Sequence, residues 1–186
     1  MVQFPKIKFC YSRVYARTVH GLAKGGSNPS ANSFQTIWRK TKAEGKLLEL
    51  LFRKFEREIM ATIPKITGFS WEEFAEPIIC VYPLKGIASF SHPLTIHVRK
   101  DTLLTIGILI HELVHNNMGF KFPSAELQEQ IVSTAALMVL EKISLPAEPY
   151  FLFSEKVHKR RFTKSFIPLE ELKGQTVKSY LDKLKH

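Results

Sequence analysis

The stretch TLLTIGILIHELVHNNMGF, residues 102–120, sets two histidines and a glutamate within an otherwise apolar run. Asp101 stands just before it, where an aspartate can cap the first turn of a helix, and Gly119 stands where a helix can end. We therefore expect a helix over residues 102–118. Because apolar residues occupy nearly all of its sides, this helix is expected to lie inside the core.

The two histidines of this helix are four positions apart, so their side chains share one face. His111 and His115 can each present one ring nitrogen to a single metal ion. Glu112 is rotated about 100° from His111 around the helix, beside such an ion, where it can accept a proton and return it. The alternative is a pair of core histidines bonded to neighbouring residues. We favour the metal site, because burying three ionisable residues in an apolar helix is costly unless a ligand or partners satisfy them.

A tetrahedral catalytic metal site needs a third protein ligand, with the fourth position left open. A third histidine six residues after His115 would make a metzincin-type site, but the residue at that position is Lys121. The next histidine along the chain is His158, far off in the C-terminal part. The third ligand is therefore expected among the acidic residues of the segment that follows the histidine helix.

The segment AELQEQIVSTAALMVLEKIS, residues 125–144, predicts a second helix, with Ser124 as its cap. Glu129 falls within the arc of the apolar residues of this helix and so points inward. Glu126 falls at the edge of that arc and in the first turn, where an acidic residue interacts favourably with the helix dipole without any metal. We predict that Glu129 is the third metal ligand, and Glu126 is the alternative.

The remaining sequence predicts one α+β domain over residues 1–186. The stretches PIICVYP (77–83) and PLTIHVR (93–99) are short, rich in β-branched residues and bounded by proline or glycine, so both predict strands. Residues 34–63 have apolar residues at helical spacing and predict a long helix that Pro64 and Gly68 close. We expect a small mixed sheet packed on the histidine helix and on the glutamate helix that follows.

Three parts can be distinguished within this domain. Residues 1–35 form a basic N-terminal extension that contains a flexible stretch rich in Gly, Ser and Asn at 21–33. Residues 36–144 form the catalytic core. Residues 145–186 form a C-terminal segment that is long enough to cover a cleft. Within this segment, residues 168–185 predict an amphipathic terminal helix with a proline in its first turn.

Composition and charge exclude several classes of protein. With 45% hydrophobic residues among 186, the chain can build one globular core. The formal net charge of +10 is concentrated in the flanks, residues 1–60 above all, so contact with nucleic acid is conceivable. We favour a solvated lysine-rich surface, because no nucleic-acid-binding motif accompanies the charge. Without a signal peptide or a membrane-spanning run, we expect a cytoplasmic protein in which Cys10 and Cys80 are reduced thiols.

The pattern HELVH, followed by a glutamate on the next helix, resembles the gluzincin clan of zinc metallopeptidases. The small size of the chain is most similar to that of the archaeal minigluzincins, and the resemblance covers about residues 71–144. It implies a zincin-like fold and one Zn²⁺ ion held by His111, His115 and Glu129. It also implies that Glu112 acts as general base and then as general acid.

The resemblance extends to the surroundings of the metal. It implies that the substrate lies antiparallel to an edge strand before the active-site helix, here residues 93–99, with Thr95, Ile96 and His97 as substrate-binding residues. In this arrangement His97 would be a candidate to stabilise a developing oxyanion. In the clan, the residue four positions after the glutamate ligand is commonly Asp or Asn and orients a histidine; here Ser133 stands there instead.

Tyr82 and Tyr150 are further candidate donors to an oxyanion, with no pattern in the sequence that selects between them. Minigluzincin precursors also resemble this chain in carrying a C-terminal segment that can cover the cleft, which implies that residues 145–186 could keep the enzyme latent as a zymogen.

The function expected from the sequence is therefore that of a zinc-dependent endopeptidase acting on a peptide or protein substrate. Two alternatives come from other classes. One is a DNA- or repressor-associated zinc metalloprotein that acts on one specific partner, suggested by the basic residues 1–60. The other is a non-catalytic zinc-binding protein whose open metal position is filled by its own chain. The sequence leaves the substrate and the oligomeric state open.

Overall fold

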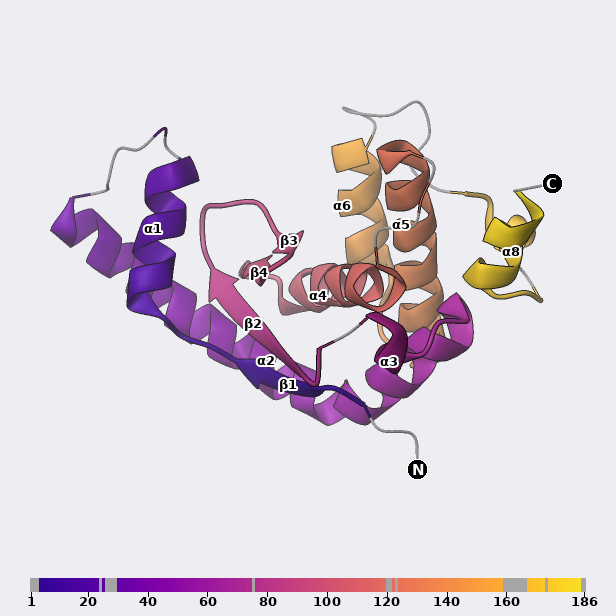
Figure 1. The fold of residues 1–186 in the computed structure, drawn as a ribbon. Coiled ribbons are helices and arrows are strands. Elements are labelled where there is room, and N and C mark those ends of the chain that lie inside the picture. Colours follow the sequence, from indigo (N-terminus) through magenta and orange to yellow (C-terminus); the bar gives the residue numbers. More distant parts are fainter. Residues whose placement is uncertain are drawn as a thin grey trace.

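A computed structural model describes residues 4–23, 25, 30–74, 76–119, 122, 124–158, 167–172 and 174–184. It confirms an α+β fold with a small mixed sheet (Figure 1). The described elements follow in the order β1 (Lys6–Phe9), α1 (Arg13–Ala23), α2 (Ala31–Thr67), α3 (Trp71–Phe74), β2 (Ile78–Leu84), β3 (Phe90–Ser91), β4 (Leu94–His97), α4 (Thr102–Met118), α5 (Ala125–Lys142), α6 (Glu148–His158), α7 (Leu169–Leu172) and α8 (Val177–Lys183).

The described strands form one sheet in the order β1-β2-β4-β3, with β1, β2 and β4 parallel and β3 antiparallel to β4. The expectation that residues 93–99 form an edge strand is wrong. Phe90 and Ser91 of β3 pair with Thr95 and Leu94, so they cover the edge that β4 would otherwise expose. A strand of two residues has too little alternation to be recognised in a sequence.

The long helix α2 runs beneath the sheet and the other helices (Figure 1). It continues through Pro64, one of the two residues that we expected to close it, and ends at Thr67, with Gly68, the other, in the left-handed conformation as its cap. Proline cannot donate a hydrogen bond to the carbonyl four residues earlier, which belongs to Met60. The indole N–H of Trp71 donates to that carbonyl at 2.8 Å. The helix therefore tolerates Pro64 because another element satisfies the freed acceptor.

Helices α4 and α5 begin where the sequence predicts. The Asp101 carboxylate accepts a hydrogen bond from the N–H of Leu104, and the Ser124 hydroxyl accepts one from the N–H of Leu127, so both predicted caps are confirmed. Most of α4 is buried, because it contacts α2, α5, α6 and the strands β3 and β4. Figure 1 shows α5 and α6 side by side across α4. In the ranges that the structure describes, no helix combines the length and the apolar character that a membrane crossing requires.

The C-terminal part differs from the prediction. Instead of one helix over residues 168–185, two short helices, α7 and α8, are separated by Gly174 in the left-handed conformation, and Thr176 caps the second. Helix α8 packs on α2. Helix α6, which the sequence did not predict, packs on α4 and α5 and so brings the C-terminal segment to the predicted metal site.

Candidate metal centre

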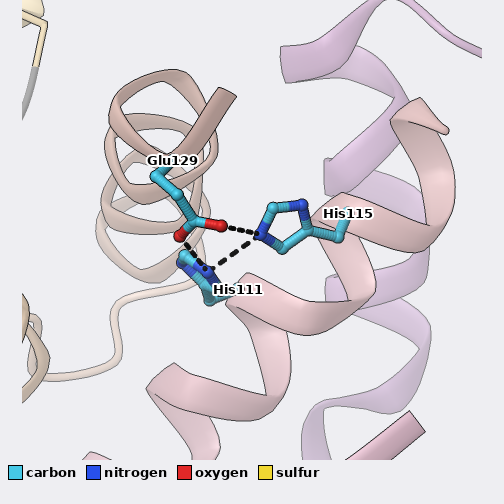
Figure 2. A group of neighbouring side chains, drawn as sticks. All are labelled: His111, His115 and Glu129. Carbon is cyan, nitrogen blue, oxygen red and sulfur yellow. Dashed lines mark hydrogen bonds and ion pairs between the residues drawn. The ribbon is translucent and has the colours of Figure 1, made fainter. Parts of the chain in front are cut away.

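Three predicted ligands, two from α4 and one from α5, converge on one point (Figure 2). The Nε2 atoms of His111 and His115 are 3.1 Å apart. The carboxylate oxygens of Glu129 lie 3.4 Å from Nε2 of His111 and 3.2 Å from Nε2 of His115. Ligand atoms placed tetrahedrally at 2.0–2.1 Å from one zinc ion would be about 3.3–3.4 Å from each other. The spacing of the three side chains therefore fits a single ion.

The donor set is electrically suited to a divalent cation. Two imidazoles and one carboxylate are the ligands of many catalytic zinc sites. Burial alone would raise the pKa of Glu129, but the hydrogen bonds and charges of His111 and His115 outweigh it and hold that pKa well below its usual range. Glu129 is therefore ionised at neutral pH, which is the state that binds a metal.

Glu126, the alternative ligand, is not part of the group. Its carboxylate accepts a hydrogen bond from the side-chain amide of Gln130 at 3.3 Å, along the outer side of α5. The structure therefore brings Glu129, and not Glu126, to the two histidines.

Glu112 lies beside the ligands and is 7% exposed. Burial raises its pKa to about 7, and the Glu129 carboxylate adds to this effect while His115 opposes it. A carboxylate with a pKa near the working pH can both accept and release a proton, which is what a general acid–base group requires.

Tyr150 of α6 is not one of the predicted ligands, but it contacts one of them. Its hydroxyl lies 2.7 Å from Nδ1 of His111, on the side of the ring opposite the ligand atom. The same hydroxyl contacts those of Ser133 and Ser154. Ser133, which stands in place of the Asp or Asn that commonly orients a histidine, thus contacts Tyr150. A hydrogen bond on the far nitrogen of a histidine ligand fixes its tautomer and orientation.

The approach of α6 to α4 depends on Gly107. A Cβ atom at this position would lie 2.6 Å from Cβ of Tyr150, much closer than side-chain atoms approach one another. Any larger residue would therefore push Tyr150 away from His111. A glycine in the middle of an apolar helix is the one signal in the sequence that indicates such a close contact.

The second histidine also has a neighbour on its far nitrogen. The side-chain amide nitrogen of Gln128 lies 3.4 Å from Nδ1 of His115. Gln128 belongs to the first turns of α5, one residue before the glutamate ligand. Sequence analysis did not single it out, since a polar residue near a helix start is usually a solvated one.

The centre opens into a cleft of about 580 Å³. One wall is the segment that leads into and includes β3, residues 88–91, and another wall is α6. Glu112, His111, His115 and Glu129 lie between these walls, together with His97 and Arg99 from the end of β4. The α6 wall is formed by Tyr150, Phe153, Ser154 and Val157.

The predicted substrate-binding residues lie in different places. Thr95 and Ile96 are both 0% exposed, and Ile96 belongs to the hydrophobic core, so neither side chain lines the cleft. The hydroxyl of Thr95 instead bonds that of Tyr15 at 2.6 Å. His97 does line the cleft. Of the two candidate tyrosines, Tyr150 lines the cleft, whereas Tyr82 packs against the ring of Tyr15.

His97 is neutral at pH 7. Its pKa is lowered to about 4, by burial first and then by the nearby charges of Arg99 and Lys85. The N–H of Gly86 donates to its Nε2 at 3.3 Å, so the ring proton resides on Nδ1. Only Nδ1 could therefore donate to an oxyanion, and that role of His97 stays a prediction.

The C-terminal segment contributes α6 to the site, and of its other described side chains those of residues 167, 168, 171, 172 and 174–184 do not line the cleft. Residues 159–166, 173, 185 and 186 of the segment that we expected to cover the cleft lie outside the described ranges. Comparison with known proteins leaves the site unassigned, since no protein-family model matches the chain and neither the curated proteins nor the solved structures yield a match.

Proposed function

We propose that this protein is a zinc-dependent endopeptidase with a zincin-like active site of the gluzincin type. One observation carries the proposal: two histidine nitrogens lie 3.1 Å apart and each is 3.2–3.4 Å from one of the two oxygens of the Glu129 carboxylate, with a buried glutamate beside them, in the lining of a cleft. Two histidines and one carboxylate suit zinc in both ligand type and number, and they leave one position free for reacting groups.

The residues have separate parts in the proposed reaction. When bound, zinc supplies a Lewis acid that polarises a carbonyl and makes water more acidic. The Glu112 carboxylate accepts a proton from the water whose oxygen attacks the peptide carbonyl carbon. Glu112 then delivers this proton to the peptide nitrogen as the carbon–nitrogen bond breaks, which returns the carboxylate to its starting state. Tyr150 holds His111 in the orientation in which Nε2 faces the metal position.

Metal content is the first test of the proposal. Elemental analysis of protein purified without added metal should find about one zinc per chain in the wild type. Glu129→Gln should lose this zinc, because an amide is a poor zinc ligand. Glu126→Gln is the matched control, on the same helix but outside the ligand group, and should retain it. Wild-type protein that binds no metal even when zinc is supplied would sink the proposal.

Catalysis requires a second test. Glu112→Gln should keep the zinc but cleave peptides about 10²–10⁴ times more slowly, because it removes only the proton-transfer group. A wild-type protein that holds zinc but cleaves no peptide, before or after trimming of its C-terminal segment, would favour the non-catalytic zinc protein. Binding to DNA that weakens steeply with salt would favour the DNA-associated alternative.

A further inference from the structure

Arg99 is a charged residue in the cleft without a charged partner. Its guanidinium lies over the ring of Phe153, 4.6 Å from the ring centroid, and both residues line the cleft. Its Nε atom is buried and has no hydrogen-bond partner among the described residues. Burial lowers the pKa of Arg99, which shows that the protein makes the charged form costly at this position.

The chain does not supply the missing anion from its described part. Of its acidic side chains, only Glu170 is undescribed, and none of the others lies within ion-pair distance of Arg99. Lys85 is paired with Glu44, and His97, whose pKa Arg99 and Lys85 help to lower, is neutral at pH 7. A half-buried guanidinium that makes no ion pair with the described residues is unfavourable unless an anion binds there.

The position of Arg99 is fixed by the fold. Its backbone N–H donates to the hydroxyl of Thr105 at 3.2 Å, which ties the end of β4 to the first turns of α4. The ring of Phe153 supports one face of the guanidinium and so restricts the plane in which it lies. A guanidinium held in one plane presents its N–H groups as a fork that matches the two oxygens of a carboxylate.

We propose that Arg99 binds a carboxylate of the peptide substrate, so that the cleft selects peptides with a negative charge near the scissile bond. The carboxylate can belong to an Asp or Glu side chain or to a free C-terminus, and the chemistry of recognition is the same for both. This inference rests on the proposed peptidase function. It assigns the substrate class that the same cleft accepts, and Arg99 is its specificity-determining residue.

The test measures binding, which does not require cleavage. The protein carries Glu112→Gln and is loaded with zinc, so that a bound peptide is not cut. The probes are fluorescein-labelled hexapeptides of alanine and phenylalanine with one Glu at each position in turn, and the same set with Gln. Each is made with a free and with an amidated C-terminus. Fluorescence anisotropy gives Kd of every peptide for three zinc-loaded proteins: Glu112→Gln alone, Glu112→Gln with Arg99→Gln, and Glu112→Gln with Lys100→Gln as the matched control.

Lys100 is a suitable control because it adjoins Arg99 in sequence and is exposed, so its replacement removes the same charge outside the cleft. We expect at least about tenfold tighter binding of a carboxylate peptide than of its neutral counterpart, since hydrogen bonds to charged groups are among the strongest. Arg99→Gln should abolish this preference, and Lys100→Gln should leave it intact.

The pattern of preference identifies the source of the carboxylate. If Glu is preferred over Gln at one position, the site binds an acidic side chain; if only the free C-terminus is preferred, it binds the chain end. Equal binding of charged and neutral peptides, no binding of any peptide, or a preference that survives Arg99→Gln would overturn the inference. With Glu112 intact, Arg99→Gln could instead bind every peptide as tightly as the wild type does but cleave all of them more slowly by the same factor. That result would assign Arg99 to stabilising the oxyanion rather than to binding a carboxylate.

The outcomes for the peptidase and for Arg99 remain distinguishable. The protein can show the Arg99-dependent preference in binding and yet, with Glu112 intact, cleave none of these peptides. That result would support the carboxylate site and contradict the peptidase proposal. A protein that cleaves these peptides equally well whatever their charge would support the peptidase proposal and contradict the carboxylate site at Arg99.

Discussion

The hydroxyl of Tyr150 lies 2.7 Å from Nδ1 of His111, although 39 residues separate them in sequence. When Nε2 of His111 holds a metal, the ring proton is on Nδ1, which then donates to the tyrosine oxygen. Helix α6 therefore contacts a proposed metal ligand that belongs to α4. This contact makes α6 of the C-terminal segment a structural part of the candidate metal centre.

Replacing Tyr150 by Phe should weaken zinc binding by about 10–100-fold, the usual effect of removing a group that orients a ligand. The phenyl ring keeps the packing, so the effect comes from the lost hydroxyl. Competition with a chromophoric chelator measures the affinity. Tyr180→Phe is the control, because the Tyr180 hydroxyl bonds Glu171 on α7, outside the cleft lining. Equal zinc affinity in Tyr150→Phe and wild type would show that the contact does not orient His111.

Replacing Gly107 by Ala should destabilise the protein, even though alanine favours a helix by about 1 kcal/mol. The new methyl group would meet Tyr150 at 2.6 Å, and such overpacking costs about 1–3 kcal/mol. Urea unfolding measures the change. In a protein that already carries Tyr150→Gly, the same substitution should no longer destabilise, because the clashing Cβ and ring atoms of Tyr150 are gone. The same loss of stability on both backgrounds would place the clash elsewhere.

Trp71→Phe should lower the free energy of unfolding by about 1–3 kcal/mol, because it leaves the Met60 carbonyl without a donor. Pro64 cannot replace the lost bond, since it has no N–H. Adding Pro64→Ala should restore part of the stability, because the alanine N–H can donate to Met60. Trp38→Phe serves as the control for loss of an indole. A double variant no more stable than Trp71→Phe alone would show that the indole acts only by packing.

His97 should lower the stability of the folded protein as the pH drops from about 6.5 toward 4, whereas Glu112, whose pKa is raised to about 7, acts in the opposite direction over this range. The pKa of His97 is lowered to about 4 in the folded protein, by burial first, then by Arg99 and Lys85, with Glu44 opposing and His20 adding a smaller lowering. In this pH range the unfolded chain binds the proton more readily, so acidity favours unfolding. Above the unfolded pKa the contribution is fully present.

Relative to wild type, His97→Gln should become steadily more stable as the pH falls from 6.5 to 4, because glutamine does not titrate there and the opposing contribution of Glu112 is the same in both proteins. Thermal unfolding in a series of buffers measures this difference, and His92→Gln, on an exposed histidine, is the control. Parallel curves for His97→Gln and wild type would mean that other groups account for the acid sensitivity.

The sequence by itself determined the parts of the site that lie within single helices. The cap at Asp101, the apolar run after it and the four-residue spacing of the histidines are local features, and a helix converts them into a fixed geometry. The inward direction of Glu129 followed from the same periodicity on α5. These choices hold because the rise and rotation per residue of a helix do not depend on the rest of the fold.

The tertiary structure decided which residues from other elements reach that geometry. Tyr150 belongs to α6, and the close packing of α6 on α4 depends on Gly107 of α4. The sequence of one helix does not predict how it packs against another. β3 covers the backbone edge of β4 by a pairing too short to leave a period in the sequence. Arg99 becomes a candidate for binding a substrate carboxylate only because, among the described residues, its guanidinium contacts the ring of Phe153 and makes no ion pair. Contacts between distant segments depend on packing, which the periodicity of one segment does not encode.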